Sequence, residues 1–271
     1  SMGISELNHM IDHALASGLN SGDISAMSYA YRLITFLLGV LMVPLTTVMF
    51  SRMSRMAASH NESGVLEVLR HCVLVIALVA LPIVAIAVVI KFAYMRGAFG
   101  MDSVRVTAGI LIFYVIGVPA FGMRDFLNRL FHALKDTKTP FRVACLVVGL
   151  NIVLNLILRK FMGANGLAFA TSIAGACGMM VMFFLLRRRF GGLGFKAILP
   201  DLVRIVIATL ACTAACLGMN ALLPEVFGTG WVFIRLVAVT GVSALVYAIC
   251  CYALGIKIFR EFFGGLLHRV H

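Results

Sequence analysis

Long apolar runs alternate with short polar segments along this chain. Seven runs of sixteen or more residues contain no Asp, Glu, Lys or Arg; they are 33–51, 71–90, 106–123, 143–158, 166–186, 205–224 and 236–256. A helix needs about 20 apolar residues to cross a hydrocarbon layer about 30 Å thick. The pattern therefore predicts an all-α fold, a polytopic membrane helix bundle of about eight transmembrane helices.

The helices are expected to extend a few residues beyond the apolar runs. Their predicted ranges are 3–19, 23–50, 65–91, 104–133, 140–158, 166–188, 201–223 and 231–255. Pro44, Pro82 and Pro119 fall inside these ranges, and each proline removes one backbone hydrogen bond. We expect neighbouring helices to satisfy the carbonyl groups that the prolines leave free.

Composition supports a membrane protein. The hydrophobic fraction is 62% and the mean hydropathy is +1.03, whereas soluble domains are about 45–50% apolar. The net charge of +12 could suggest nucleic-acid binding. However, the basic residues lie mostly between the apolar runs, as orienting charges do, so nucleic-acid binding is not expected. The cysteines lie inside apolar runs and predict neither a metal site nor disulfides.

Lys and Arg in the connections predict the orientation. The larger set lies on one side, and it comprises Arg52, Arg55, Lys135, Lys138, Arg142, Arg187, Arg188, Arg189, Lys196, Lys257, Arg260 and Arg269. We therefore predict a multi-pass membrane protein in which this side, together with the C-terminus, is cytoplasmic.

Arg32 is predicted to lie at membrane depth. It stands nine residues into helix 23–50, about 13 Å from the outer end at 1.5 Å per residue. An arginine there must face protein, water or an anionic ligand, and its guanidinium suits phosphate. We expect it to bind substrate, with pairing to a carboxylate such as Asp12 as the alternative. Ser25 lies two turns earlier on the same face and is expected to line the same cavity.

A second group of polar residues converges near the outer surface. Asp12, Asn151, Asn155 and Thr171 should each lie roughly 5–10 Å below it. A carboxylate, two amides and a hydroxyl offer hard oxygen ligands that suit a small cation such as Na⁺. A hydrogen-bond network without an ion explains the same residues equally well.

The inner end of helix 104–133 carries Arg124, Asp125, Asn128 and Arg129. Asp125 and Arg129 have the i, i+4 spacing of an ion pair. A solvated, self-paired helix end is the simpler interpretation, with substrate binding by Arg124 as the alternative. The chain contains no Gly-rich phosphate loop, paired catalytic carboxylates or nucleophile elbow. We therefore predict that it is not an enzyme.

Several segments together resemble a known family in order and spacing. They are Ile11-Asp12 with Ala16-Ser17, Gly22–Leu33, Thr46-Thr47 with Ser51–Arg55, Arg96–Phe99, Ala133–Pro140 and Gly166–Ser172. The chain is similar to the MurJ/MviN proteins, which are lipid II flippases of the multidrug/oligosaccharidyl-lipid/polysaccharide exporter superfamily. The likeness covers about 5–190.

The resemblance implies a fourteen-helix architecture, with two six-helix lobes around a cationic cavity and two further C-terminal helices. On this basis 1–190 would form the second lobe, 191–200 a cytoplasmic linker, 201–255 the two last helices with a groove for the polyprenyl tail, and 256–271 a cytoplasmic tail. The first lobe would be missing, and the abrupt start at Ser1-Met2-Gly3 leads us to expect a fragment.

The resemblance also implies roles for particular residues. Arg32 matches the cavity arginine expected to meet the lipid II pyrophosphate, and Ser25 matches a cavity-lining serine. Some family members hold Na⁺ at the positions that match Asp12, Asn151, Asn155, Thr171 and the carbonyl group of Leu167. Three positions depart from the family pattern, and one of them is His13, which stands where a basic Arg is common. Tyr31 stands where many members have an acidic residue, and Asn155 is Asp in some, so a sodium site here would carry less negative charge.

We therefore expect this chain to serve in flipping lipid II by alternating access, with lipid II and membrane lipids as its partners and Na⁺ as its candidate ion. A related exporter of another polyprenyl-linked glycan and a membrane scaffold that does not transport are the alternatives. A drug exporter should prefer an acidic cavity, so Arg32 counts against that reading.

Overall fold

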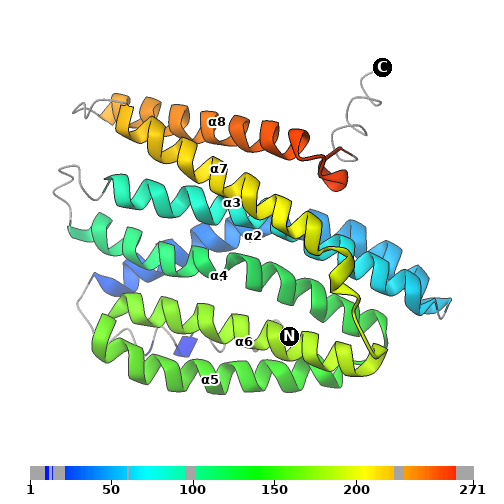
Figure 1. Ribbon diagram of the computed structural model, residues 1–271. Coiled ribbons are helices and arrows are strands. Elements are labelled where there is room, and N and C mark those ends of the chain that lie inside the picture. The colour runs from blue at the N-terminus through cyan, green and yellow to red at the C-terminus, as the bar shows by residue number, and fades with distance from the viewer. Residues whose placement is uncertain are drawn as a thin grey trace. The chain divides into compact units, whose positions relative to one another are not determined.

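Helices make up the part of the chain that the structure describes. The structure is a computed structural model, and it describes residues 10, 11, 14, 22–59, 61–94, 102–222 and 229–260. Its elements (Figure 1) are α2 (Asp23–Ala58), α3 (Glu62–Tyr94), α4 (Asp102–Ala133), α5 (Lys138–Met162), α6 (Ala164–Phe190), the short 3-10 turn η1 (Phe195–Ala197), α7 (Leu199–Leu222) and α8 (Thr229–Ala253). The expected all-α membrane bundle is confirmed.

Six helices in the described residues are long and apolar enough to cross a membrane. They are Glu62–Val88, Val106–Ala133, Lys138–Met162, Ala164–Phe190, Leu199–Leu222 and Ile234–Ala253. The 36-residue helix α2 contributes a shorter apolar stretch, Ile24–Val40. The predicted first helix lies outside the described residues except for positions 10, 11 and 14, so the number of eight spans stays a prediction.

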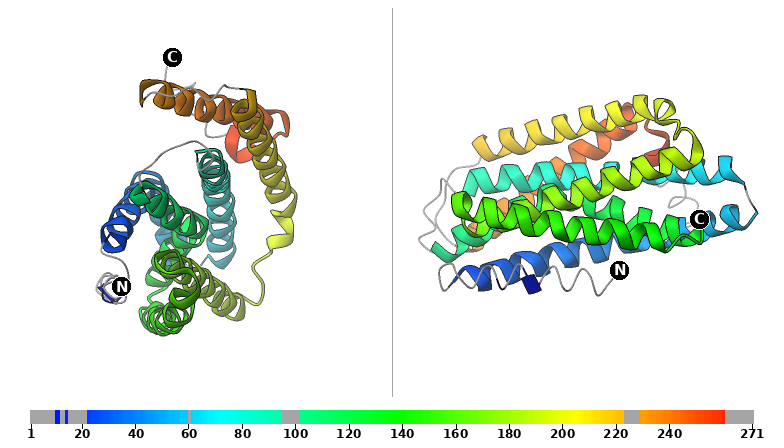
Figure 2. Two further views of the ribbon diagram at one scale, coloured as in Figure 1. Left: turned by 90° about the vertical axis from the view of Figure 1, so that its left-hand side faces the viewer. Right: turned by 90° about the horizontal axis from the view of Figure 1, so that it is seen from below.

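The chain divides into two compact units. The first comprises Ser1–Cys72 with Gly100–Leu193, and the second comprises Val73–Phe99 with Gly194–His271. In the first unit α4 packs against both α2 and α6, and α5 packs against α6 (Figures 1 and 2). α4 has the largest buried share of the membrane-spanning candidates, because it has a packed neighbour on two sides.

Close contact between α5 and α6 depends on small residues. Ala170 and Ala174 of α6 are fully buried. A Cβ added to Gly178 would lie 2.4 Å from Cγ2 of Val147, and one added to Gly166 would lie 2.4 Å from a backbone carbonyl oxygen of α5. The stripe of small residues in α6 is therefore a packing seam, as expected for membrane helices.

α4 ends in a Schellman turn. The amide of Asp136 donates to the carbonyl of Phe131 (2.9 Å), and the amide of Lys135 donates to that of His132 (3.0 Å). This arrangement requires a left-handed residue at its centre, which is usually glycine. Lys135 occupies that place with φ of 58°, so a lysine stands where glycine would cost less free energy.

Asp136 caps the first turn of α5. Its carboxylate accepts hydrogen bonds from the backbone amides of Lys138 (3.2 Å) and Thr139 (3.0 Å) and from the Thr139 hydroxyl (2.7 Å). These bonds satisfy amides that the helix cannot pair internally. Nη1 of Arg189 lies 4.0 Å from the same carboxylate, which joins the end of α6 to this turn.

The second unit pairs α7 with α8 and includes the later part of α3. Pro82 lies inside α3 and has no amide hydrogen for the carbonyl of Leu78, four residues earlier. The hydroxyl of Tyr247 in α8 donates to that carbonyl at 2.7 Å. A neighbouring helix thus satisfies the carbonyl that this proline frees, as expected.

The division into two units can be compared with the predicted boundary between the lobe at 1–190 and the last two helices at 201–255. The first unit ends at Leu193, whose carbonyl accepts a hydrogen bond from Nε of Arg70 at 3.0 Å. The division also falls inside α3, after Cys72. The assignment of 1–190 to a lobe and of 201–255 to a lipid-tail groove stays a prediction.

Candidate substrate and cation sites

Arg32 and Ser25 share the exposed face of α2. The opposite face, which includes Met27 and Ala30, is buried, and α2 packs on α4. Arg32 and Ser25 are themselves exposed. Within the described part of the chain, no hydrogen bond or ion pair joins Arg32 to another residue. Its guanidinium is therefore available to a ligand, while the alternative partner Asp12 lies outside the described residues.

The candidate cation residues of α5 and α6 form one hydrogen-bonded chain. The amide of Asn155 donates to Oδ1 of Asn151 (2.8 Å), the amide of Asn151 donates to Oγ1 of Thr171 (3.1 Å), and this hydroxyl donates to the carbonyl of Leu167 (3.1 Å). Both asparagines are fully buried. The structure thus brings together four of the five residues proposed for Na⁺, and the fifth, Asp12, is not among those described.

Arg32 and this polar chain lie at the same level of the bundle. Tyr31 packs edge-on against Tyr114 of α4, with ring centroids 6.2 Å apart. The hydroxyl of Ser172 in α6 donates to the carbonyl of the residue before that tyrosine at 2.6 Å. These two contacts fix α2 and α6 to the same turn of α4, so Arg32 and Thr171 share a height along the helices.

The backbone of Arg124 lies further along α4 than the turn that contains Tyr114. It follows Tyr114 by ten residues on α4, which places it about 15 Å further along the helix. A Cβ added to Gly178 of α6 would lie 3.5 Å from Cδ of Arg124, so the arginine stem runs against α6. Its charge still interacts with Tyr31, the residue beside Arg32, and a role of Arg124 in substrate binding stays a prediction.

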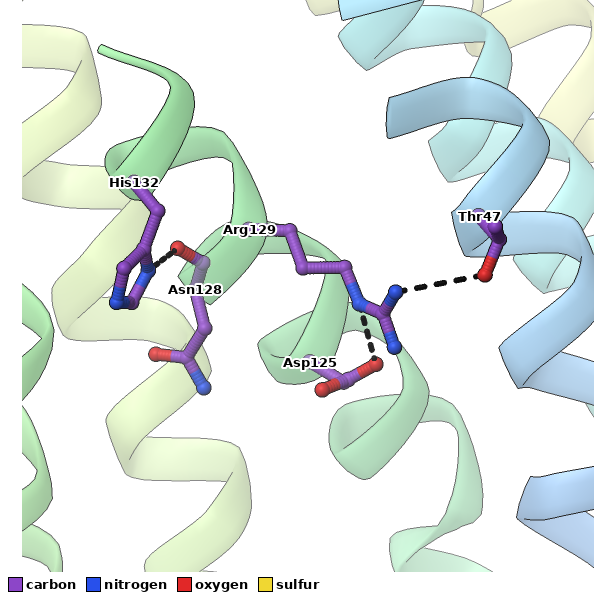
Figure 3. Close-up of polar contacts among 5 residues, drawn as sticks. All are labelled: Thr47, Asp125, Asn128, Arg129 and His132. Carbon is purple, nitrogen blue, oxygen red and sulfur yellow. Dashed lines mark hydrogen bonds and ion pairs between the residues drawn. The ribbon is translucent and has the colours of Figure 1, made fainter. Parts of the chain in front are cut away.

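The C-terminal end of α4 is self-paired, as the spacing predicted (Figure 3). Nε of Arg129 lies 3.2 Å from Oδ2 of Asp125. Nη1 of the same arginine donates to Oγ1 of Thr47 in α2 at 3.5 Å. On the neighbouring face, Nδ1 of His132 is hydrogen-bonded to the carbonyl of Asn128. This group connects the C-terminal halves of α2 and α4.

A half-buried polar contact between α7 and α8 was not predicted from the sequence. Nη2 of Arg235 in α8 donates to both the backbone carbonyl and Oδ1 of Asn220 in α7, each at 2.8 Å. The arginine satisfies carbonyl oxygens near the C-terminus of α7, where cations are favourable. An arginine at the edge of an apolar run, paired with an asparagine at the end of the previous run, was the available signal.

The long apolar helices, with few polar groups inside them and those hydrogen-bonded between helices, define a multi-pass α-helical membrane protein. Comparison with known families is consistent with this class and narrows it. Residues 1–238 match the family described as lipid II flippase MurJ. The chain belongs to that family, and the resemblance noted from its motifs is confirmed.

Curated relatives show the same likeness. A probable lipid II flippase MurJ of Thermotoga maritima is 30% identical over 203 residues, covering 74% of this chain and 43% of the relative. That of Borreliella burgdorferi is 26% identical over 263 residues, covering 95% of this chain and 52% of the relative. The chain thus spans about half the length of the relatives it matches.

Solved structures share the fold. A lipid II flippase MurJ in an inward closed conformation matches 98% of this chain and 52% of its own, with a TM-score of 0.69 and 24% identity. An outward-facing MATE multidrug transporter of the MOP superfamily matches 96% of this chain and 64% of its own, with a TM-score of 0.61 and 16% identity. At these identities the likeness concerns the helical architecture alone.

Proposed function

We propose that this chain serves in flipping lipid II across the bacterial cytoplasmic membrane by alternating access, as a transporter rather than an enzyme. Membership of the MurJ family and the names of its relatives support this proposal. The observation that carries it is the exposed guanidinium of Arg32 on an apolar helix face, without a partner in the described part of the chain.

Arg32 would bind the pyrophosphate of the substrate. A diphosphate loses a large hydration free energy when it leaves water, and a guanidinium returns part of it through two parallel, charge-assisted hydrogen bonds. Ser25, seven residues away on the same face, offers a hydroxyl donor. Tyr29 and Phe36 are 63% and 70% exposed and would flank the headgroup as the two halves of the transporter rock about it.

The α7–α8 pair would accommodate the polyprenyl tail. Its outer faces expose large apolar side chains, namely Leu210, Leu217, Leu245 and Ile249. Such side chains lose nothing by contact with an isoprenoid in place of phospholipid chains. In this arrangement the basic ends of α2, α5 and α6 face the cytoplasm, together with the C-terminus.

Replacing Arg32 tests the transport role. In a strain that depends on this gene for flipping, Arg32→Ala should abolish growth, because losing hydrogen bonds to a charged group weakens binding about tenfold or more. Growth, membrane abundance and unfolding temperature should be measured together. Lys160→Ala, which removes another exposed cation, should support growth. Normal growth on Arg32→Ala alone would refute the proposal.

We also propose that the polar chain of α5 and α6 binds Na⁺. The set offers three oxygen atoms, namely Oδ1 of Asn151, Oγ1 of Thr171 and the carbonyl oxygen of Leu167, and each accepts a hydrogen bond within the polar chain. Oxygen donors suit hard cations, so these residues fit the ion, and Asp12 would add a negative charge. Bound Na⁺ would supply positive charge that favours one conformation of the bundle.

Thermal unfolding in NaCl, compared with choline chloride at equal ionic strength, tests the sodium site. Na⁺ should raise the unfolding temperature of the wild type, since a ligand that binds the folded state stabilises it. Thr171→Ala should lose this response. Thr209→Ala is a matched control, because that hydroxyl also donates to a carbonyl four residues earlier in its own helix, at 2.8 Å. An equal Na⁺ response in the wild type and Thr171→Ala would exclude the site.

A further inference from the structure

Six exposed cations gather where the α4–α5 turn meets the end of α6. This group, called the basic end below, consists of Lys135, Lys138, Arg142, Arg187, Arg188 and Arg189. The 4.0 Å contact between Arg189 and Asp136 brings the two segments together, although about fifty residues separate them in the sequence. Figure 1 shows the α4–α5 turn and the end of α6 at the same end of the first unit.

Few negative charges lie close enough to neutralise the six cations of the basic end. Asp136 is the only carboxylate in segments 134–142 and 184–192, all of which the structure describes. Its oxygens already accept the hydrogen bonds that cap α5. Like charges held this close repel one another and attract anions, so an external anion would lower the electrostatic energy of the group.

Two features indicate that the cations of the basic end are held in position to bind a ligand. The guanidinium of Arg188 lies over the ring of Phe184, 4.5 Å from its centroid, which orients a side chain that would otherwise be mobile. Lys135 keeps a left-handed backbone conformation, with φ of 58°, where glycine would be less strained. Such conformations persist only where the surrounding structure holds them, and they cluster at ligand-binding sites.

Apolar side chains continue from the basic end along the same two helices. Phe141 and Phe184 are 60% and 52% exposed, and Leu146 and Val153 of α5 are 50% and 54% exposed. A soluble phosphate would use the cations but not this surface. A molecule with a phosphate headgroup and acyl chains would use both.

We propose that the basic end binds anionic glycerophospholipids, with the headgroup phosphate on the cations and the acyl chains along α5 and α6. The site is independent of the transport proposal, because it does not involve Arg32 or the polar chain of α5 and α6. It recognises negative charge in the leaflet that faces this end of the bundle.

Native mass spectrometry of the full chain, delipidated in neutral detergent, tests the site. Dioleoylphosphatidylglycerol and dioleoylphosphatidylcholine are titrated separately, and the anionic lipid should bind more tightly. Lys138→Gln with Arg142→Gln should weaken its binding about tenfold or more, since each surface cation contributes about a fivefold factor. Arg159→Gln with Lys160→Gln is the matched control: it removes one Lys and one Arg from the other end of α5 and should leave binding unchanged.

The variant Lys135→Gly distinguishes the effect of the lysine charge on lipid binding from its effect on the stability of the fold. It should raise the unfolding temperature, because glycine relieves the left-handed strain, and should still weaken binding of the anionic lipid. Three results would overturn the proposal: equal affinity for the two lipids, equal loss in both double variants, or displacement of the lipid by inorganic phosphate at the same concentration. The last result would show that the basic end recognises phosphate without a lipid.

Discussion

A single phenol group in α8 takes the place of the amide that Pro82 lacks in α3. Tyr247 is buried, and its hydroxyl lies 2.7 Å from the Leu78 carbonyl oxygen. A carbonyl without a partner inside a membrane protein is costly. The proline and the tyrosine are therefore expected to depend on each other, although they lie on different helices.

Tyr247→Phe should lower the free energy of unfolding by about 0.5–2 kcal/mol, because it leaves the Leu78 carbonyl unsatisfied. Thermal unfolding in detergent would measure the loss. Tyr252→Phe serves as the control, since Tyr252 is 65% exposed. In a Pro82→Ala background the restored amide should make Tyr247→Phe nearly neutral. An undiminished loss there would show that the tyrosine acts through its packing.

Asp136 should stabilise the protein in a pH-dependent way. Hydrogen bonds from the Thr139 hydroxyl and amide lower the pKa of this carboxyl below its ordinary value of 3.8. Because the folded pKa is the lower one, the stabilisation is complete above about pH 4 and is lost as pH falls through the folded pKa. Asp136→Ala should therefore cost about 1 kcal/mol at pH 7 and progressively less under acid conditions.

Unfolding temperatures of the wild type and Asp136→Ala between pH 7 and pH 2 would check this. Thr137→Ala is the control, because Thr137 occupies the N-cap position of α5 but makes no capping hydrogen bond with its side chain. The capping role would be wrong if Thr137→Ala were as damaging as Asp136→Ala at neutral pH.

At the scale of the helices, α5 and α6 form a hairpin whose backbones touch. A Cβ on Gly166 would lie 2.4 Å from the Leu158 carbonyl oxygen and 3.1 Å from the Arg159 amide nitrogen. Backbone atoms cannot move aside as side chains can, so the absence of a side chain at 166 sets the distance between the helices. The polar chain proposed to bind Na⁺ lies between the same two helices.

Gly166→Ala should separate α5 from α6 and cost about 1–3 kcal/mol. Gly149→Ala should instead stabilise the chain by about 0.5–1 kcal/mol, because nothing lies within 4 Å of the added Cβ. Thermal unfolding of the two variants provides the comparison. Any Na⁺ response should weaken in Gly166→Ala only. Similar effects of both alanines would show that helix propensity, not close approach, determines the outcome.

The apolar runs predicted where helices lie but not how far they extend. α2 was expected to end near residue 50 and continues to Ala58, and α5 was expected at 140–158 and spans Lys138–Met162. The extra turns carry Arg, Lys, Met and Ala, which have high helix propensity. They add no hydropathy signal, so a pattern based on apolar runs omits them.

At the scale of the molecule, the sequence could predict which site residues meet when their depth along neighbouring helices was enough to bring them together. Asn151 and Thr171 meet because α5 and α6 are consecutive, antiparallel and closely packed, so equal depth brought them together. Arg124 could not be placed in this way. Its position depends on the rotation of α4, which directs the stem against α6, and rotation is weakly encoded when a helix is apolar on all sides.

α2 consists of 36 consecutive helical residues, so it is about 54 Å long, far more than the thickness of the hydrocarbon layer. With Arg32 at the membrane depth predicted from the sequence, the last turns of α2, which include the exposed residues Arg52 and Arg55, would stand in water. A probe attached near Arg52 or Arg55 would shift together with the guanidinium of Arg32, because both stand on one continuous helix. A water-soluble reagent on one side of the membrane could thus report on events at its centre.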